Sequence, residues 1–147
     1  MPKALRNALA LLAGIILGGA VNMALVTLSP WLVPPPPGVD VNDAGSLANG
    51  MRLFEPRHFA MPFLAHAAGT LVGACAASLL AASRRALMAY VIGAAFLCCG
   101  VAASFMIPAP AWFVALDLAV AYLPMAWLGA RMGAPMMQGK KGAGTGA

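Results

Sequence analysis

The amino-acid sequence predicts an all-α integral membrane protein, an antiparallel four-helix bundle whose helices run up-down-up-down. The composition, the length of the apolar runs and the placement of the charges all support this fold class. The 147 residues are 62% hydrophobic and only 9% charged, whereas soluble domains carry roughly 25% charged residues. Because so little charge cannot coat a water-facing surface of this size, we expect the apolar surface to face lipid and neighbouring helices.

Four apolar runs cover residues 8–33, 59–82, 86–107 and 111–130. Each run reaches the length of about 20 residues that a helix needs to cross a hydrocarbon core. Asp117 is the only residue in the four runs that is normally ionised at neutral pH. We therefore expect a single membrane domain over residues 1–131, followed by a flexible cytoplasmic tail over the Gly- and Lys-containing stretch 132–147.

The basic residues predict the orientation of the chain in the membrane. Seven of the nine fall on one side of a four-span chain: Lys3, Arg6, Arg84, Arg85, Arg131, Lys140 and Lys141. The other side carries Arg52 and Arg57 together with three acidic residues. The positive-inside rule then puts both termini in the cytoplasm. We read the basic residues as contacts to the lipid bilayer rather than to nucleic acid, which would favour interleaved aromatic residues.

The outer loop, residues 34–58, is the only long connection between the runs. It opens with four consecutive prolines, which cannot continue a helix. Asp43 is then a candidate N-cap for a short helix that ends at Phe54. One face of this helix would be apolar and suited to the membrane surface; the stripe consists of Leu47, Met51 and Phe54. An irregular loop is the alternative.

Small residues predict where the helices pack. Gly14 and Gly18 recur at a spacing of four in the first run, and Gly69 and Gly73 do the same in the second. Such rows let the backbones of two membrane helices approach closely. Pro124 lies inside the fourth run and predicts a kink there.

His66 and Asp117 are the candidate polar pair within the membrane. Each lies a few residues inside the outer end of its run, so the two side chains are expected at matched depth. A lone ionised Asp in hydrocarbon costs about 2.5 to 3.5 kcal/mol on insertion scales, and a His partner reduces that cost. Asn22 and Thr70 are supporting polar candidates. The pair is either a proton relay or a buried hydrogen bond that fixes helix packing.

Glu55, Arg57 and His58 are candidates at the outer interface. Glu55 and His58 form a single Glu-x-x-His motif, but Pro56 lies inside it and di-iron bundles use two such motifs. We therefore expect no metal site, and nothing in the sequence predicts a cofactor.

Two stretches of the sequence carry a family resemblance. Residues 54–59 (FEPRHF) continue into 62–73 (PFLAHAAGTLVG), and residues 116–118 (LDL) precede 121–127 (AYLPMAW). Both resemble small, uncharacterised four-span bacterial inner-membrane proteins of no assigned activity. The resemblance implies the same fold and a multi-pass location in the bacterial cell inner membrane, and it implies no reaction.

Three classes of function follow from these observations. A structural or accessory protein that acts through helix–helix contacts explains the glycine rows and the scarcity of polar groups, and it is our first expectation. A proton-coupled small transporter or channel would use His66 and Asp117. A membrane-embedded lipid or quinone enzyme would add Glu55 and His58. The first expectation is not an enzyme, and its partners would be further copies of the chain or a larger membrane complex.

Overall fold

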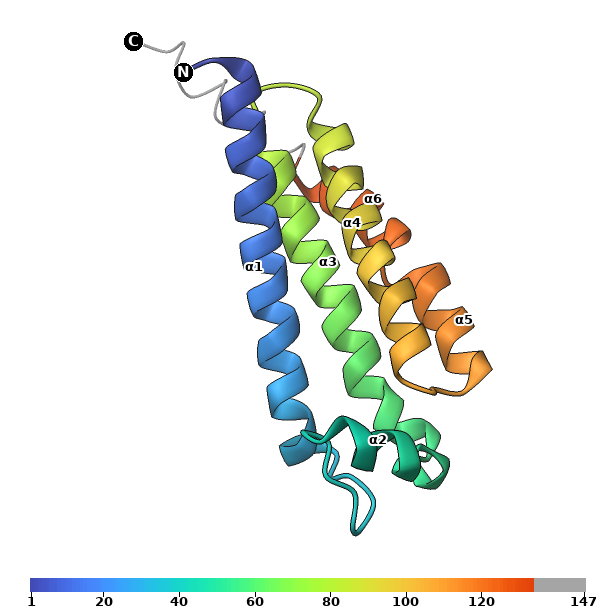
Figure 1. Ribbon diagram of the computed structural model, residues 1–147. Helices are drawn as coiled ribbons and strands as arrows, with labels where there is room; N and C mark the ends of the chain where they lie inside the picture. The colour runs from blue at the N-terminus through green and yellow to red at the C-terminus, as the bar shows by residue number, and fades with distance from the viewer. Residues whose placement is uncertain (134–147) are drawn as a thin grey trace.

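The computed structural model describes residues 1–133, and all regular structure in this part of the chain is helical (Figure 1). The prediction of an all-α class is confirmed. The α-helices are α1 (Lys3–Leu32), α2 (Ala44–Gly50), α3 (Ala60–Leu80), α4 (Arg85–Met106), α5 (Ala111–Val120) and α6 (Leu123–Gly133). Two 3-10 helices, η1 (Met51–Leu53) and η2 (Pro56–Phe59), lie between α2 and α3.

Four helical stretches are long and apolar enough to cross a membrane, which confirms that the chain has the features of a multi-pass membrane protein. They are Lys3–Leu32, Pro56–Leu80, Arg85–Met106 and Ala111–Gly133. The last helix continues past residue 131, where we predicted the membrane domain to end. The remainder of the predicted tail, residues 134–147, lies outside the described residues.

The helix α3 lies at the centre of the bundle and packs against α1 through the two predicted glycine rows (Figure 1). A Cβ atom added to Gly14 would lie 2.7 Å from the carbonyl oxygen of Gly73, and one added to Gly73 would lie 2.7 Å from the carbonyl oxygen of Gly14. Gly18 and Gly69 approach each other in the same reciprocal way. The two backbones are therefore in direct contact, as small residues in membrane helices allow.

The helix α6 packs against another side of α3, at the end of the bundle where α1 begins. A Cβ atom on Gly129 would lie 2.9 Å from the backbone nitrogen of Cys75 in α3. One on Gly93 of α4 would lie 2.5 Å from the Cβ of Ala126 in α6. Ile92 is fully buried at this level, among a core made largely of alanine side chains. This half of the bundle is consequently tightly packed.

The fourth span is interrupted rather than merely kinked. The α5 helix ends at Val120 and α6 begins at Leu123, with a turn at Ala121 and Tyr122. Pro124 explains the break, because it has no N–H to donate to the carbonyl of Val120. Because Tyr122 lies in this turn, its side chain does not point in the direction that a continued α5 helix would give it.

The outer loop folds back onto the end of the bundle where α3 and α5 begin. The carboxylate of Asp43 caps α2 by accepting the backbone N–H of Ser46 at 2.6 Å. The helix continues as η1 and ends at Leu53, one residue short of the predicted end. Its apolar stripe packs against Phe59 and Phe113. The prediction that this stripe lies on the membrane surface is therefore wrong, because the end of the bundle covers it.

Candidate functional site

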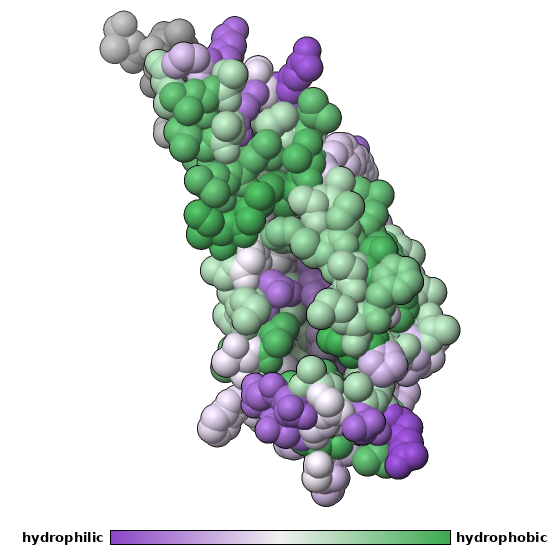
Figure 2. Space-filling view, in the orientation of Figure 1, coloured by the Kyte–Doolittle hydropathy of each residue, from purple (hydrophilic) through white to green (hydrophobic). Residues whose placement is uncertain are grey.

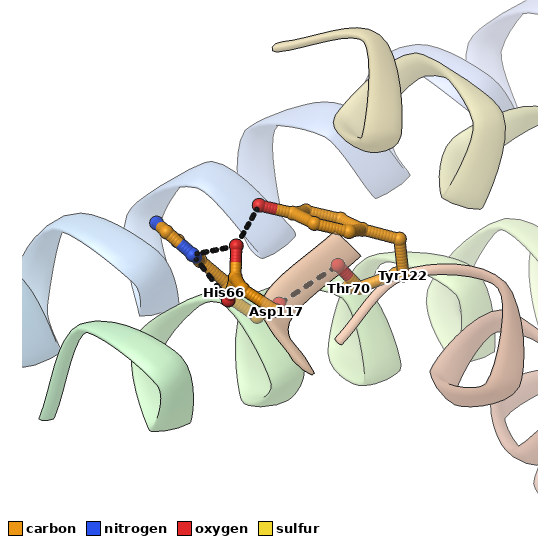
Figure 3. Close-up of polar contacts among 4 residues, drawn as sticks. All are labelled: His66, Thr70, Asp117 and Tyr122. Atoms are coloured by element: carbon orange, nitrogen blue, oxygen red, sulfur yellow. Dashed lines mark hydrogen bonds and ion pairs between the residues drawn. The ribbon is translucent and has the colours of Figure 1, made fainter. Parts of the chain in front are cut away.

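Three side chains form a hydrogen-bonded cluster inside the bundle (Figure 3). The Nδ1 atom of His66 lies 2.9 Å from Oδ1 and 3.0 Å from Oδ2 of Asp117. The hydroxyl of Tyr122 donates to Oδ2 of Asp117 at 3.0 Å. The His66 and Tyr122 rings stack with their centroids 5.8 Å apart. Asp117 and Tyr122 are buried, at 5% and 3% exposure, so the carboxylate is satisfied entirely by protein partners.

Each member of the cluster comes from a different structural context. His66 lies in the second turn of α3, Asp117 lies in the last turns of α5, and Tyr122 lies in the turn after α5. Thr70, one turn further along α3, is buried and donates its hydroxyl to the backbone carbonyl of His66 at 2.8 Å. The hydroxyl of Thr70 is therefore hydrogen-bonded within α3 and does not donate to Asp117.

A cavity of about 790 Å³ lies beside this cluster. Its side walls come from α1, which contributes Val26 and Thr27, and from α4, which contributes Ala103. The lining also includes residues from the first turns of α3 and one face of α5, and the folded outer loop forms the floor. His66 and Asp117 are among the lining residues, so the polar cluster borders a mostly apolar cavity.

The cavity exists because α1 and α4 separate toward the outer loop. The two helices are in contact where Gly18 faces Phe96, since a Cβ atom on Gly18 would lie 2.8 Å from that ring. Beyond this contact Thr27 and Ala103 line the same cavity from its two walls. Figure 2 shows the surface hollowed in this region, with hydrophilic residues visible inside the hollow and hydrophobic residues around much of its rim.

The ring of His66 has one nitrogen left for a ligand. Its Nδ1 is held by Asp117, and no residue in the described part of the chain hydrogen-bonds to its Nε2. The side chain is 28% exposed, and Figure 3 shows the second ring nitrogen on the side away from Asp117. A histidine oriented in this way by a carboxylate can donate a hydrogen bond through Nε2 when protonated and accept one when neutral.

The remaining candidate residues lie apart from the cluster. Asn22 packs against Gly69, and its buried amide oxygen has no hydrogen-bond partner within residues 1–133. Glu55 and Arg57 form an ion pair of 3.0 Å at the exposed end of the bundle. His58 lies in η2 at the same end of the bundle and is buried, and its Nδ1 caps η2 by accepting the backbone N–H of Glu55 at 2.9 Å. Over the described residues, no group of three or more His, Cys, Asp or Glu side chains is arranged to hold a metal ion.

Tyr122 is the member of the cluster that sequence reasoning missed. One signal was available: a tyrosine inside an apolar run has a hydroxyl that needs a hydrogen-bond partner in the membrane. Asp117, five residues earlier in the same run, was the nearest acidic candidate. The spacing of five does not place two residues on one face of a regular helix, and only the break before Pro124 brings them together.

Comparison of the chain with protein-family models, with curated proteins and with solved structures gave no match.

Proposed function

We propose that this chain is an accessory protein of the bacterial inner membrane that binds a small lipid-like molecule in the cavity, with a hydrogen bond to Nε2 of His66. One observation carries the proposal: a carboxylate-oriented histidine borders a mostly apolar cavity of about 790 Å³ and has a nitrogen without a protein partner in the described chain. Ligand sites in proteins are typically concave and apolar, with a few placed polar groups.

The proposed orientation puts this cavity in the outer half of the membrane. In an up-down-up-down arrangement with both termini in the cytoplasm, the excess of Lys and Arg lies on the cytoplasmic side. The outer loop and the cavity above it then face the periplasm. Because the cavity lies between α1 and α4, a ligand would enter sideways from the outer leaflet.

Binding fits the packing better than proton transport. A proton path needs a continuous polar file through the bilayer. The polar file that starts at His66 ends at Tyr122 and Thr70, and beyond them the bundle is closed by the fully buried Ile92 and its alanine neighbours. A purely structural histidine–aspartate pair, in turn, does not account for the cavity beside it. The proposal assigns the protein no reaction.

Native mass spectrometry of the full chain, extracted from its membrane in mild detergent, tests this function. We expect a bound molecule of lipid-like mass to remain on the wild type. Ala103→Phe places a ring in the wall of the cavity and should remove that molecule. Ala102→Phe is the matched control, because Ala102 is exposed on the same helix and does not line the cavity.

The comparison of the two variants decides the outcome. Retention of the bound mass by both variants, or its loss from both, would place the lipid on the outer surface of the bundle and contradict cavity binding. The thermal midpoint of each variant should be measured alongside, so that a general loss of folding is not read as loss of the ligand.

A further inference from the structure

The cavity has an unusual distribution of ionisable side chains. Four of them line it: Asp40, His58, His66 and Asp117. Of the lysines and arginines in the described chain, none lines it. The basic residues thus lie away from the cavity, and it carries no permanent positive charge.

The two histidines do not supply a free positive charge either. The Nδ1 atom of His58 accepts the backbone N–H of Glu55 and lies 3.2 Å from the carbonyl oxygen of the same residue, so it is already engaged with the backbone. His66, when protonated, forms an ion pair with Asp117 whose net charge is zero. A carboxylate, sulfate or phosphate head group would therefore enter an apolar cavity without a counter-ion and beside an existing carboxylate. Burial of an unpaired charge in such surroundings is strongly unfavourable.

A cationic head group finds no free carboxylate near the cluster. Both oxygens of Asp117 are already used, because they contact Nδ1 of His66 and one also accepts from Tyr122. Asp40 lies at an exposed position in the outer loop, where its Oδ1 accepts the backbone N–H of Asn42 at 2.8 Å and its Oδ2 has no hydrogen-bond partner in the described chain. Beside the cluster, the cavity therefore offers a ligand apolar surface and the Nε2 atom of His66, which pairs with one neutral oxygen. Its other polar lining residues are Thr27, Ser29, Asp40, Asn42 and Ser104, which come from the ends of α1 and α4 and from the outer loop.

We infer that the ligand is an uncharged lipid whose head group presents a hydroxyl or carbonyl oxygen to Nε2 of His66, and that anionic lipids are excluded. This inference rests on the proposed function and specifies the class of ligand. A hydroxyl would donate to the neutral ring, and a carbonyl would accept from the protonated ring.

Four probes with the same ten-carbon chain separate these possibilities: decanol, decyl-benzoquinone, decyl sulfate and decane. The full chain is kept in maltoside micelles, and each probe is added at equal mole fraction in the micelle. The readout is ¹⁵N NMR of labelled histidine, since the chain contains only two histidines. A purification tag without histidine preserves this simplicity, and His66→Gln assigns the resonances.

We expect decanol or decyl-benzoquinone, or both, to shift the Nε2 resonance of His66 saturably and the His58 resonances much less. The loss of one hydrogen bond predicts that decane binds about five- to tenfold more weakly than decanol in competition. Decyl sulfate should leave the resonance unchanged. Which of the two neutral probes binds more tightly then separates an alcohol from a quinone as the source of the oxygen.

The opposite results are distinguishable from one another. Decyl sulfate that binds as tightly as decanol would overturn the exclusion of anions while leaving cavity binding intact. Decane that displaces decanol at equal mole fraction would overturn the role of the head-group oxygen. The proposed function itself fails if no probe shifts a resonance of either histidine and no probe competes with another.

Discussion

Gly100 of α4 and Tyr122 are packed so closely that a Cβ atom on Gly100 would overlap the tyrosine hydroxyl. That hydroxyl is the group that donates to Asp117. The missing side chain at Gly100 is therefore what allows the tyrosine to reach the carboxylate, and α4 helps to shape the cluster without contributing a polar group to it.

Gly100→Ala should displace the Tyr122 ring and break its hydrogen bond to Asp117. Overpacking of this kind costs typically about 1–3 kcal/mol, more than the up to about 1 kcal/mol that an alanine gains over glycine in a helix. We expect a lower thermal midpoint in detergent. Gly19→Ala is the matched control, because a Cβ atom there has no neighbour within 4 Å, and it should leave the midpoint unchanged or slightly raised.

The loss in Gly100→Ala should depend on the tyrosine hydroxyl. Tyr122→Phe removes the hydroxyl, the nearest of the three Tyr122 atoms that the new methyl group would overlap, and leaves the two ring carbons. The overlap is then smaller, so the double variant should lose less stability than the sum of the two single variants. If the double variant instead loses as much stability as the two single variants together, Gly100 acts through some contact other than the tyrosine hydroxyl.

His66→Ala should destabilise the bundle by about 3 kcal/mol, because it leaves the buried carboxylate of Asp117 with Tyr122 as its remaining side-chain partner. Asp117→Asn should cost less, since an amide still hydrogen-bonds to both neighbours. Thermal unfolding of the single and double variants measures the coupling. Strictly additive effects would be at odds with the 2.9 Å contact between the two side chains.

Gly73→Leu should separate α1 from α3. The new side chain would meet the carbonyl oxygen of Gly14, a backbone atom that cannot move aside cheaply. We expect a loss of about 3 kcal/mol or more, at the upper end of overpacking effects. Val72→Leu, at an exposed position one residue earlier, adds a similar side chain on the lipid-facing surface and should keep the wild-type midpoint.

Reporter fusions test the proposed orientation. Fusions after Arg85 and within the last ten residues should behave as cytoplasmic, and fusions within residues 34–58 should behave as periplasmic. The reason is the charge distribution, with seven of the nine basic residues predicted on the cytoplasmic side. A periplasmic signal from the C-terminal fusion would contradict the four-span topology.

The sequence predicts the long helices well, because each span is an unbroken apolar run and lipid leaves few alternatives to a helix. It also predicts the face of α3 that meets α1, since Gly69 and Gly73 are the two glycines of α3 and lie four residues apart. The matched depth of His66 and Asp117 is likewise readable from the ends of their runs.

The sequence does not predict which side chains surround His66 and Asp117. No pattern fixes the rotation of α5 about its axis, and the break after Val120 changes the direction of Tyr122. The apolar stripe of the outer loop predicts that one face is covered, but the pattern is the same whether lipid or Phe113 covers it. The cavity depends on how far α1 and α4 diverge, which is a property of packing along the whole bundle.

Photolabelling in membrane vesicles tests cavity binding most directly. The probe is a long-chain alcohol that carries a diazirine beside its hydroxyl, and adducts are mapped by peptide mass spectrometry. We expect adducts on the peptide that contains His66 and on residues 100–104 of α4, with both suppressed by excess decanol and by Ala103→Phe. Adducts confined to lipid-facing positions such as Leu12 and Val72, and insensitive to decanol, would contradict cavity binding.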